Sequence, residues 1–141
     1  MYYIYMEEDV RWKQRFSNFK RAFLLLRDAL DGDISKLNQL EKEGVIQRFE
    51  YTFELAWKVL KDRMEYDGII FDIISPKAVI RKAYESKYID NLEVWFNMIG
   101  DRNLMSHTYD ENKFEKIIMT TQSEYLTILD KLYMWLLEET L

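Results

Sequence analysis

The hydrophobic residues of this chain recur at spacings of three and four positions, which is the period of an amphipathic α-helix. The first such stripe predicts a helix over about residues 8–30, ended by a turn at residues 31–33 that contains Gly32. Its apolar positions are Trp12, Phe16, Phe19, Phe23, Leu26 and Leu30. They form a seam along which this helix is expected to pack.

A second stripe predicts a long helix over about residues 45–66, stopped by Gly68. Its expected buried positions are Ile46, Phe49, Phe53, Trp57, Leu60 and Met64. Residues 37–40 predict a short helical lead-in, set apart from the long helix by Gly44. We interpret the apolar stretch 69–74 as a loop pressed onto the bundle, in preference to a short strand.

Start signals mark the next two helices. Ser75 and Pro76 predict a helix that runs to about Ser86, because serine caps free amides and proline suits the first helical position. Asp90 and Glu93 have the spacing of a capping box and predict the start of the following helix. That helix is expected to turn Leu92, Phe96 and Ile99 inward.

The last helix is expected to begin after Asp110, which is suited to cap it. One apolar stripe consists of Phe114, Ile117, Thr121, Tyr125, Ile128, Leu132 and Trp135, and a second of Leu126, Leu129, Tyr133 and Leu136. Two stripes predict a helix that is buried on two sides, at the centre of the fold or at a subunit interface.

These elements predict an all-α protein, an antiparallel up-and-down helical bundle with four longer helices and one short helix. We expect one domain over residues 1–141, because two domains would each be short of core. The chain has one proline and four glycines in 141 residues. So few turn formers exclude a sandwich or barrel with many tight turns.

The composition also limits the chemistry. With no cysteine there can be no disulfide, thiolate zinc site or cysteine nucleophile. The only histidine, His107, excludes metal motifs that need two histidines from one chain, and we expect no bound metal and no cofactor. Acid–base chemistry must therefore use this one imidazole, carboxylates, or a second copy of the chain.

The formal net charge of −5 excludes a general polyanion binder, although it leaves room for a local basic patch. The first nine residues lack the basic region of a signal peptide, and the apolar run 22–26 is far shorter than the roughly 20 residues that span a bilayer. We therefore expect a cytoplasmic protein with no membrane contact.

Candidate chemistry concentrates in residues 100–110. Arg102 suits a phosphate clamp and His107 suits proton transfer. Five residues separate them by about 140° around an unbroken helix, so they converge only if the helix ends near His107 or another helix closes the site. Asp101, Asn103 and Ser106 are the polar residues expected to support the pair. The simpler interpretation is that Arg102 and His107 are a helix cap and a hydrogen-bonding residue.

Two further groups of polar residues are candidates for binding. Glu50 and Glu54 on the second long helix repel by about 0.2–0.5 kcal/mol unless a cation lies between them, and Arg48, Lys58 or Arg102 could supply it. A solvated face with a Glu54–Lys58 pair is the alternative.

The second group lies in residues 76–87, which carry four basic residues and one acidic residue. Lys77 and Arg81 share a helix face there, and they are the best candidates for contact with an RNA or nucleotide phosphate. An ordinary exposed basic surface is the alternative interpretation.

Arg102, His107 and Tyr109 follow the Arg-x4-His-x-Tyr signature of HEPN-family proteins. Residues 44–58, Gly-Val-Ile-Gln-Arg-Phe-Glu-Tyr-Thr-Phe-Glu-Leu-Ala-Trp-Lys, strongly resemble the branch called nucleotidyltransferase substrate-binding proteins. Shorter similarities occur at residues 75–77 and 106–111. The resemblance covers nearly the whole chain.

The resemblance implies a small helical bundle, usually a homodimer, that works beside a separately encoded minimal nucleotidyltransferase. One interpretation of such proteins makes them the substrate-binding subunit of that enzyme. Another makes the pair a toxin–antitoxin system. In that system the HEPN protein is a metal-independent ribonuclease, and the nucleotidyltransferase silences it by adenylylating the signature tyrosine, here Tyr109.

Three hypotheses follow. The first is a partner subunit of a minimal nucleotidyltransferase, one half of a toxin–antitoxin pair. The alternative is a metal-independent endoribonuclease that uses Arg102 and His107 in a dimer cleft and is silenced at Tyr109. Because each chain has one histidine, such a cleft requires two copies of the chain or a non-histidine acid. The third is a purely structural interaction bundle.

Overall fold

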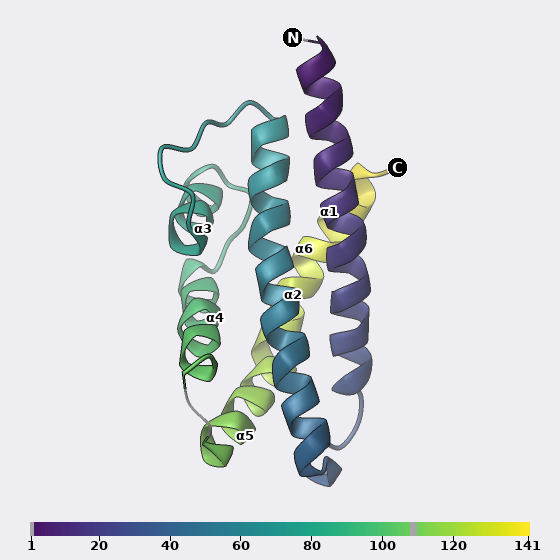
Figure 1. Ribbon diagram of the computed structural model, residues 1–141, viewed down its shortest axis with the longest axis vertical. Helices are drawn as coiled ribbons and strands as arrows, with labels where there is room; N and C mark the ends of the chain where they lie inside the picture. The colour runs from purple at the N-terminus through teal and green to yellow at the C-terminus, as the bar shows by residue number, and fades with distance from the viewer. Residues whose placement is uncertain (1, 108–109) are drawn as a thin grey trace.

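The computed structural model describes residues 2–107 and 110–141, and the secondary structure within them is helical, without strands (Figure 1). The α-helices are α1 (Tyr2–Ala29), α2 (Gln39–Tyr66), α3 (Pro76–Glu85), α4 (Leu92–Met105), α5 (Glu111–Thr120) and α6 (Leu126–Glu139). A π-helical turn, Thr121–Tyr125, joins α5 to α6 without a break. A single 3₁₀ turn, Ile34–Lys36, lies between α1 and α2.

The helices form an antiparallel bundle (Figure 1). α1 and α2 lie side by side along most of their length, α3 and α4 lie on the side of α2 away from α1, and the α5–α6 rod crosses behind α2. With α5 and α6 taken as one rod, the described residues form four longer helices and one short helix. The predicted fold class is therefore confirmed.

Both long N-terminal helices extend beyond their predicted starts. α1 begins at Tyr2 instead of near residue 8, and the Tyr5 ring packs against Tyr66 of α2 with a hydroxyl hydrogen bond between them. α2 begins at Gln39, so the separate lead-in was wrong and Gly44 lies inside the helix.

Asn38 starts α2 early through a capping box. Its side chain accepts a hydrogen bond from the Glu41 amide at 2.8 Å, and the Glu41 carboxylate accepts one from the Asn38 amide at 2.9 Å. This reciprocal pair satisfies two amides that a helix start leaves free. The cost of about 1 kcal/mol for Gly44 inside the helix is smaller than the gain from a long continuous helix with a buried face.

The predicted start of α4 was also wrong. Its first turn follows Asn91, which has a left-handed backbone (φ 56°) and makes no capping hydrogen bond through its side chain. Asp90 is exposed instead and lies 3.8 Å from Lys131. The buried residues of α4 are Trp95, Met98 and Met105, whereas the three predicted, Leu92, Phe96 and Ile99, are half-buried. The larger apolar surface of Trp95 sets which face turns inward.

The remaining predicted elements are confirmed. Ser75 accepts a hydrogen bond from the Ala78 amide at 3.2 Å and starts α3. Asp110 caps α5 by accepting hydrogen bonds from the Asn112 and Lys113 amides. Residues 69–74 form a loop as predicted, but only Ile69 and Phe71 pack against the core, whereas Ile70, Ile73 and Ile74 are exposed. Both predicted stripes of the last helix are buried, apart from the half-buried Leu126 and Trp135.

A buried ion pair joins the two longest helices. The Asp62 side chain of α2 is fully buried, and Arg15 Nε of α1 donates a hydrogen bond to its Oδ2 at 2.9 Å. Lys61 Nζ lies 3.3 Å from Oδ1, as an ion pair without hydrogen-bond geometry. Burial removes the hydration of the Asp62 carboxylate, and the two cations offset the free energy that this desolvation costs.

Candidate functional site at the end of α4

α4 ends at Met105, and this end brings the predicted site to the surface. The Ser106 amide and Oγ both donate to the Arg102 carbonyl, at 3.2 and 3.1 Å. The His107 amide donates to the Leu104 carbonyl at 3.2 Å. His107 therefore lies just beyond the helix, with an exposed side chain. The helix thus ends near His107, which is one of the conditions under which Arg102 and His107 can converge. Tyr109 lies outside the described residues.

α2 holds the Arg102 side chain in place. Arg102 Nη2 donates to Glu54 Oε2 at 2.7 Å, and both side chains keep about a third of their surface exposed (30% and 28%). Arg102 Nη1 lies 3.5 Å from Asn103 Oδ1. The guanidinium is thus fixed in orientation while part of it still faces solvent, which suits a group that receives an anion.

Glu54 carries two cations, one on each oxygen. Lys58 Nζ lies 3.3 Å from Glu54 Oε1, while Arg102 occupies Oε2. Two of the three cations expected near Glu50 and Glu54, Lys58 and Arg102, therefore contact Glu54. The third, Arg48, instead donates a hydrogen bond to the Leu25 carbonyl of α1 at 3.1 Å. This second-helix group and the α4 group form one cluster.

Within the described residues Glu50 forms no ion pair, in contrast to Glu54 of the same cluster. Burial raises the pKa of the Glu50 carboxyl above its ordinary value, and the positive charge of Arg102 lowers it only in part. The folded chain therefore holds a proton on Glu50 more tightly than the unfolded chain does.

The sign of this shift predicts a pH-dependent effect of Glu50→Gln. Ionisation of Glu50 costs stability, and the cost appears as the pH rises through the carboxyl range. Glu50→Gln is therefore expected to raise the free energy of unfolding at about pH 7 and to change it little at about pH 3. Urea denaturation at both pH values measures this, with the exposed Glu138→Gln as control. An equal effect at both pH values would contradict it.

Asp101 anchors the last turns of α4 to the π-helical turn. Tyr125 Oη donates to Asp101 Oδ2 at 2.5 Å, and the buried Tyr125 ring stacks on Phe49 with centroids 5.6 Å apart. Burial raises the pKa of Tyr125, and the Asp101 hydrogen bond raises it further, so the phenol stays a donor. Sequence reasoning placed Tyr125 only in the core. The hydroxyl of Tyr125 could have indicated this contact, because a buried tyrosine usually has a hydrogen-bond partner for its hydroxyl.

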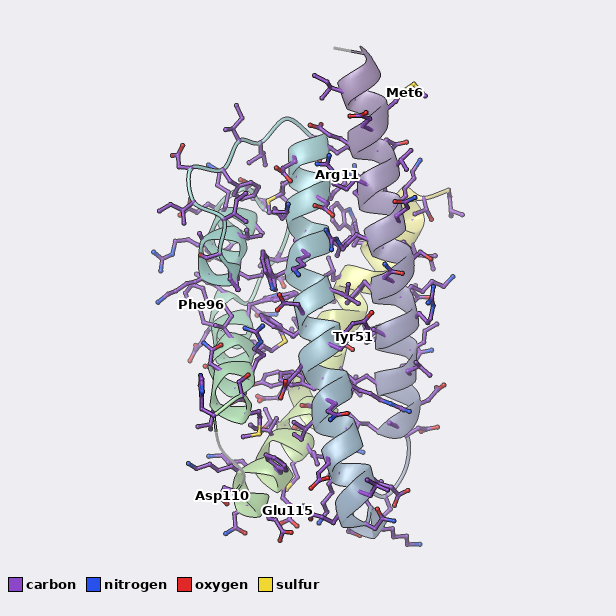
Figure 2. The ribbon with its side chains drawn as sticks, in the orientation of Figure 1. Met6, Arg11, Tyr51, Phe96, Asp110 and Glu115 are labelled. Carbon is purple, nitrogen blue, oxygen red and sulfur yellow. The ribbon has the colours of Figure 1, made fainter. Side chains whose placement is uncertain are left out.

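Lys77 and Arg81 do not join this cluster. Both are exposed on α3, and their cationic groups lie over the ring of Phe96 of α4, at 5.5 and 5.6 Å from its centroid. Figure 2 labels Phe96 near the end of α4 that lies beside α3. The predicted binding residues thus divide into two groups, one with Arg102 and one around Phe96.

Metal-binding and membrane-spanning features are both missing from the part of the chain that the structure describes. In residues 2–107 and 110–141, no three His, Cys, Asp or Glu side chains are grouped so that they could hold a metal ion. Within the same residues, no helix has the length and apolar character needed to cross a membrane.

Residues 14–138 match the family described as nucleotidyltransferase substrate binding protein like. A Haemophilus influenzae protein named probable ribonuclease HepT is 36% identical over 73 residues, which are 50% of this chain and 50% of that protein. The chain thus spans about half the length of this curated relative. A crystal structure of a Thermus thermophilus protein superposes with a TM-score of 0.71 at 30% identity, over 81% of this chain and 94% of that one. Because the family match covers most of its length, the chain belongs to the HEPN-like family of nucleotidyltransferase substrate-binding proteins.

Proposed function

We propose that this chain is the partner subunit of a separately encoded minimal nucleotidyltransferase, and that its own activity is metal-independent cleavage of RNA. The carrying observation is the end of α4, where a partly exposed guanidinium held by Glu54 lies one turn before the exposed His107. The name of the Haemophilus influenzae relative, probable ribonuclease, agrees with this chemistry.

The reaction class follows from the groups present. An imidazole takes the proton from a ribose 2′-hydroxyl, and the 2′-oxygen attacks the adjacent phosphorus. The bond from phosphorus to the 5′-oxygen breaks, that oxygen takes up a proton, and a 2′,3′-cyclic phosphate remains. His107 is the proposed base or acid, because imidazole accepts and donates protons near neutral pH. Arg102 stabilises the charge that builds on the phosphate oxygens.

This reaction needs both a base and an acid, whereas each chain has one histidine. A two-fold symmetric homodimer places two copies of His107 and Arg102 around its axis. We therefore assign the proposed active site to a dimer, and a non-histidine acid within one chain is the alternative. The test of this activity is cleavage of single-stranded RNA in EDTA by the purified chain and by His107→Ala. Cleavage by the wild type and not by the variant supports the assignment.

The partner proposal predicts a stable complex and a modified tyrosine. The chain, co-expressed with a minimal nucleotidyltransferase encoded beside it, is expected to co-purify with it and to gain the mass of adenylate at Tyr109. A nucleotide there adds bulk and negative charge two residues from His107, which excludes RNA phosphates. Tyr109→Phe should abolish the mass gain, while Tyr51→Phe, at a tyrosine 60% exposed on α2, should not. Failure to co-purify together with an unmodified chain would contradict the proposal.

A structural role alone is the competing function, and one observation favours it. The Arg102–Glu54 ion pair joins α4 to α2, so Arg102 is a tertiary contact and not the helix cap that the structural hypothesis expected. Under this hypothesis Arg102→Ala lowers stability and there is no RNA cleavage to lose. Stability and cleavage measured on the same variant separate the two functions.

A further inference from the structure

A second polar surface lies on the outer side of α3 and α4. We call it the α3–α4 face and define it by Lys77, Arg81, Phe96, Gly100 and Asn103. Lys77 Nζ and Arg81 Cζ both lie over the Phe96 ring, 5.5 and 5.6 Å from its centroid, and Phe96 is half-buried. Cations next to a partly exposed aromatic residue are the combination that binds the phosphates and bases of single-stranded nucleic acid.

The cations of this face are not neutralised by the protein. Within the described residues, no carboxylate lies within 4.0 Å of Lys77, Arg81 or their exposed neighbour Lys82. In contrast, Arg102 and Lys58 are both paired with Glu54. The chain has a net charge of −5, yet this face carries adjacent cations without carboxylate partners. It is therefore a local site for an external anion.

The face leads along α4 toward the candidate active site. Phe96, Gly100 and Asn103 are spaced by four and three residues, so they lie on one side of the helix, and His107 follows four residues later. Gly100 and Asn103 are exposed, and a Cβ placed on Gly100 meets nothing within 4 Å. Between Phe96 and Asn103, about 10 Å along α4, the helix surface is therefore open at Gly100.

We propose that the α3–α4 face is the binding platform for the RNA strand that flanks the cleaved bond, an inference that rests on the proposed ribonuclease function. Lys77 and Arg81 bind phosphates of the flanking nucleotides, and the Phe96 ring stacks on a base. Gly100 lets the backbone of the strand pass close to α4 on its way to Arg102 and His107. Stacking on Phe96 requires an unpaired base, so the substrate class is single-stranded RNA.

Binding of a labelled single-stranded oligoribonucleotide tests this platform. Fluorescence anisotropy is measured on the full chain carrying His107→Ala, so that the probe stays intact. Arg81→Glu and Phe96→Leu are each expected to weaken binding by about tenfold, and Arg81→Glu to reduce the salt dependence by about one phosphate contact. Lys20→Glu, the same charge change at an exposed position of α1, is the matched control and should bind as the parent does.

A glycine pair provides a second test that does not depend on charge. Gly100→Leu blocks the path with a side chain that favours helix and is expected to weaken binding of the same probe by about tenfold. Gly44→Leu, at the other glycine inside a helix with nothing within 4 Å of its Cβ, should leave binding unchanged. Circular dichroism of both variants confirms that each is folded.

Cleavage of a dinucleotide, measured in the chain with His107 intact, distinguishes failure of the ribonuclease proposal from failure of the platform proposal. A dinucleoside monophosphate has no second phosphate for α3, so Arg81→Glu should lose a much larger factor of activity on the oligonucleotide than on the dinucleotide. Probe binding without any cleavage would remove the ribonuclease proposal and leave the platform. Equal probe binding by parent, Arg81→Glu and Phe96→Leu, or no binding by the parent, would overturn the platform. A third result would also overturn the platform: Arg81→Glu and Phe96→Leu bind the RNA probe as the parent does but no longer bind the nucleotidyltransferase. That result would make this face a protein interface.

Discussion

Replacing His107 by alanine is expected to lower RNA cleavage by about 10²–10⁴-fold, the usual contribution of a positioned proton-transfer group. No second histidine in the chain can take its place. Its side chain is exposed beyond the end of α4, so the free energy of unfolding should change by less than about 0.5 kcal/mol. Loss of cleavage with unchanged stability separates a role in the reaction from a role in folding.

Arg102→Ala is the companion variant, with an expected loss of about 10²–10³-fold in cleavage. It also breaks the 2.7 Å ion pair with Glu54, which should cost no more than about 1 kcal/mol because both side chains are partly exposed. Glu54→Gln removes the charge of the same pair and keeps the guanidinium. Because Glu54 also orients that guanidinium, Glu54→Gln is expected to lose cleavage, but less than Arg102→Ala does. Unchanged cleavage by Arg102→Ala would contradict a role of Arg102 on the phosphate.

Asp62→Ala is expected to have the largest effect on stability, a loss of about 3–5 kcal/mol in the free energy of unfolding. The variant leaves the cations of Arg15 and Lys61 at a contact of α1 and α2 that now lacks its carboxylate. Because a domain is typically stable by about 5–15 kcal/mol, much of the fold's margin would be lost. The Arg15 side chain is 32% exposed and can turn toward water, and Lys61 keeps its ion pair with Glu65 at 3.2 Å. Both facts place the expected loss near the lower end of this range.

Urea denaturation measures this loss against an exposed ion pair. Lys131 lies 3.8 Å from Asp90, with 58% and 72% of the two side chains exposed, and Lys131→Ala should cost less than about 0.5 kcal/mol. Similar midpoints for Asp62→Ala and the wild type would show that water already solvates the Asp62 carboxylate and that the buried pair is not a source of stability.

The helices were predictable because each carries its own apolar period and most carry local start signals. Ser75 and Asp110 cap helices through contacts with the next few residues, and such contacts can be deduced from sequence. The predicted start of α2 was wrong because Gly44 does not break the helix, which a capping box of Asn38 and Glu41 starts at Gln39. The start of α4 was missed because Asn91 begins that helix without a side-chain cap.

The site was predictable only as far as one helix determines it. Spacing showed that Arg102 and His107 can share a site if α4 ends near His107, and α4 does end there. The Glu54 contact was one of several open choices, because sequence does not show which helices lie side by side. Tyr125 was missed for the same reason, since its hydrogen bond to Asp101 depends on how the π-helical turn meets α4.

The most direct test of the ribonuclease assignment is the rate of cleavage of single-stranded RNA in EDTA, for the wild type and His107→Ala side by side. We predict that the wild type cleaves at an undiminished rate in EDTA and leaves 2′,3′-cyclic phosphate ends, while His107→Ala is slower by at least about 10²-fold. Equal cleavage by both proteins, cleavage by neither, or loss of the wild-type activity in EDTA would contradict the assignment.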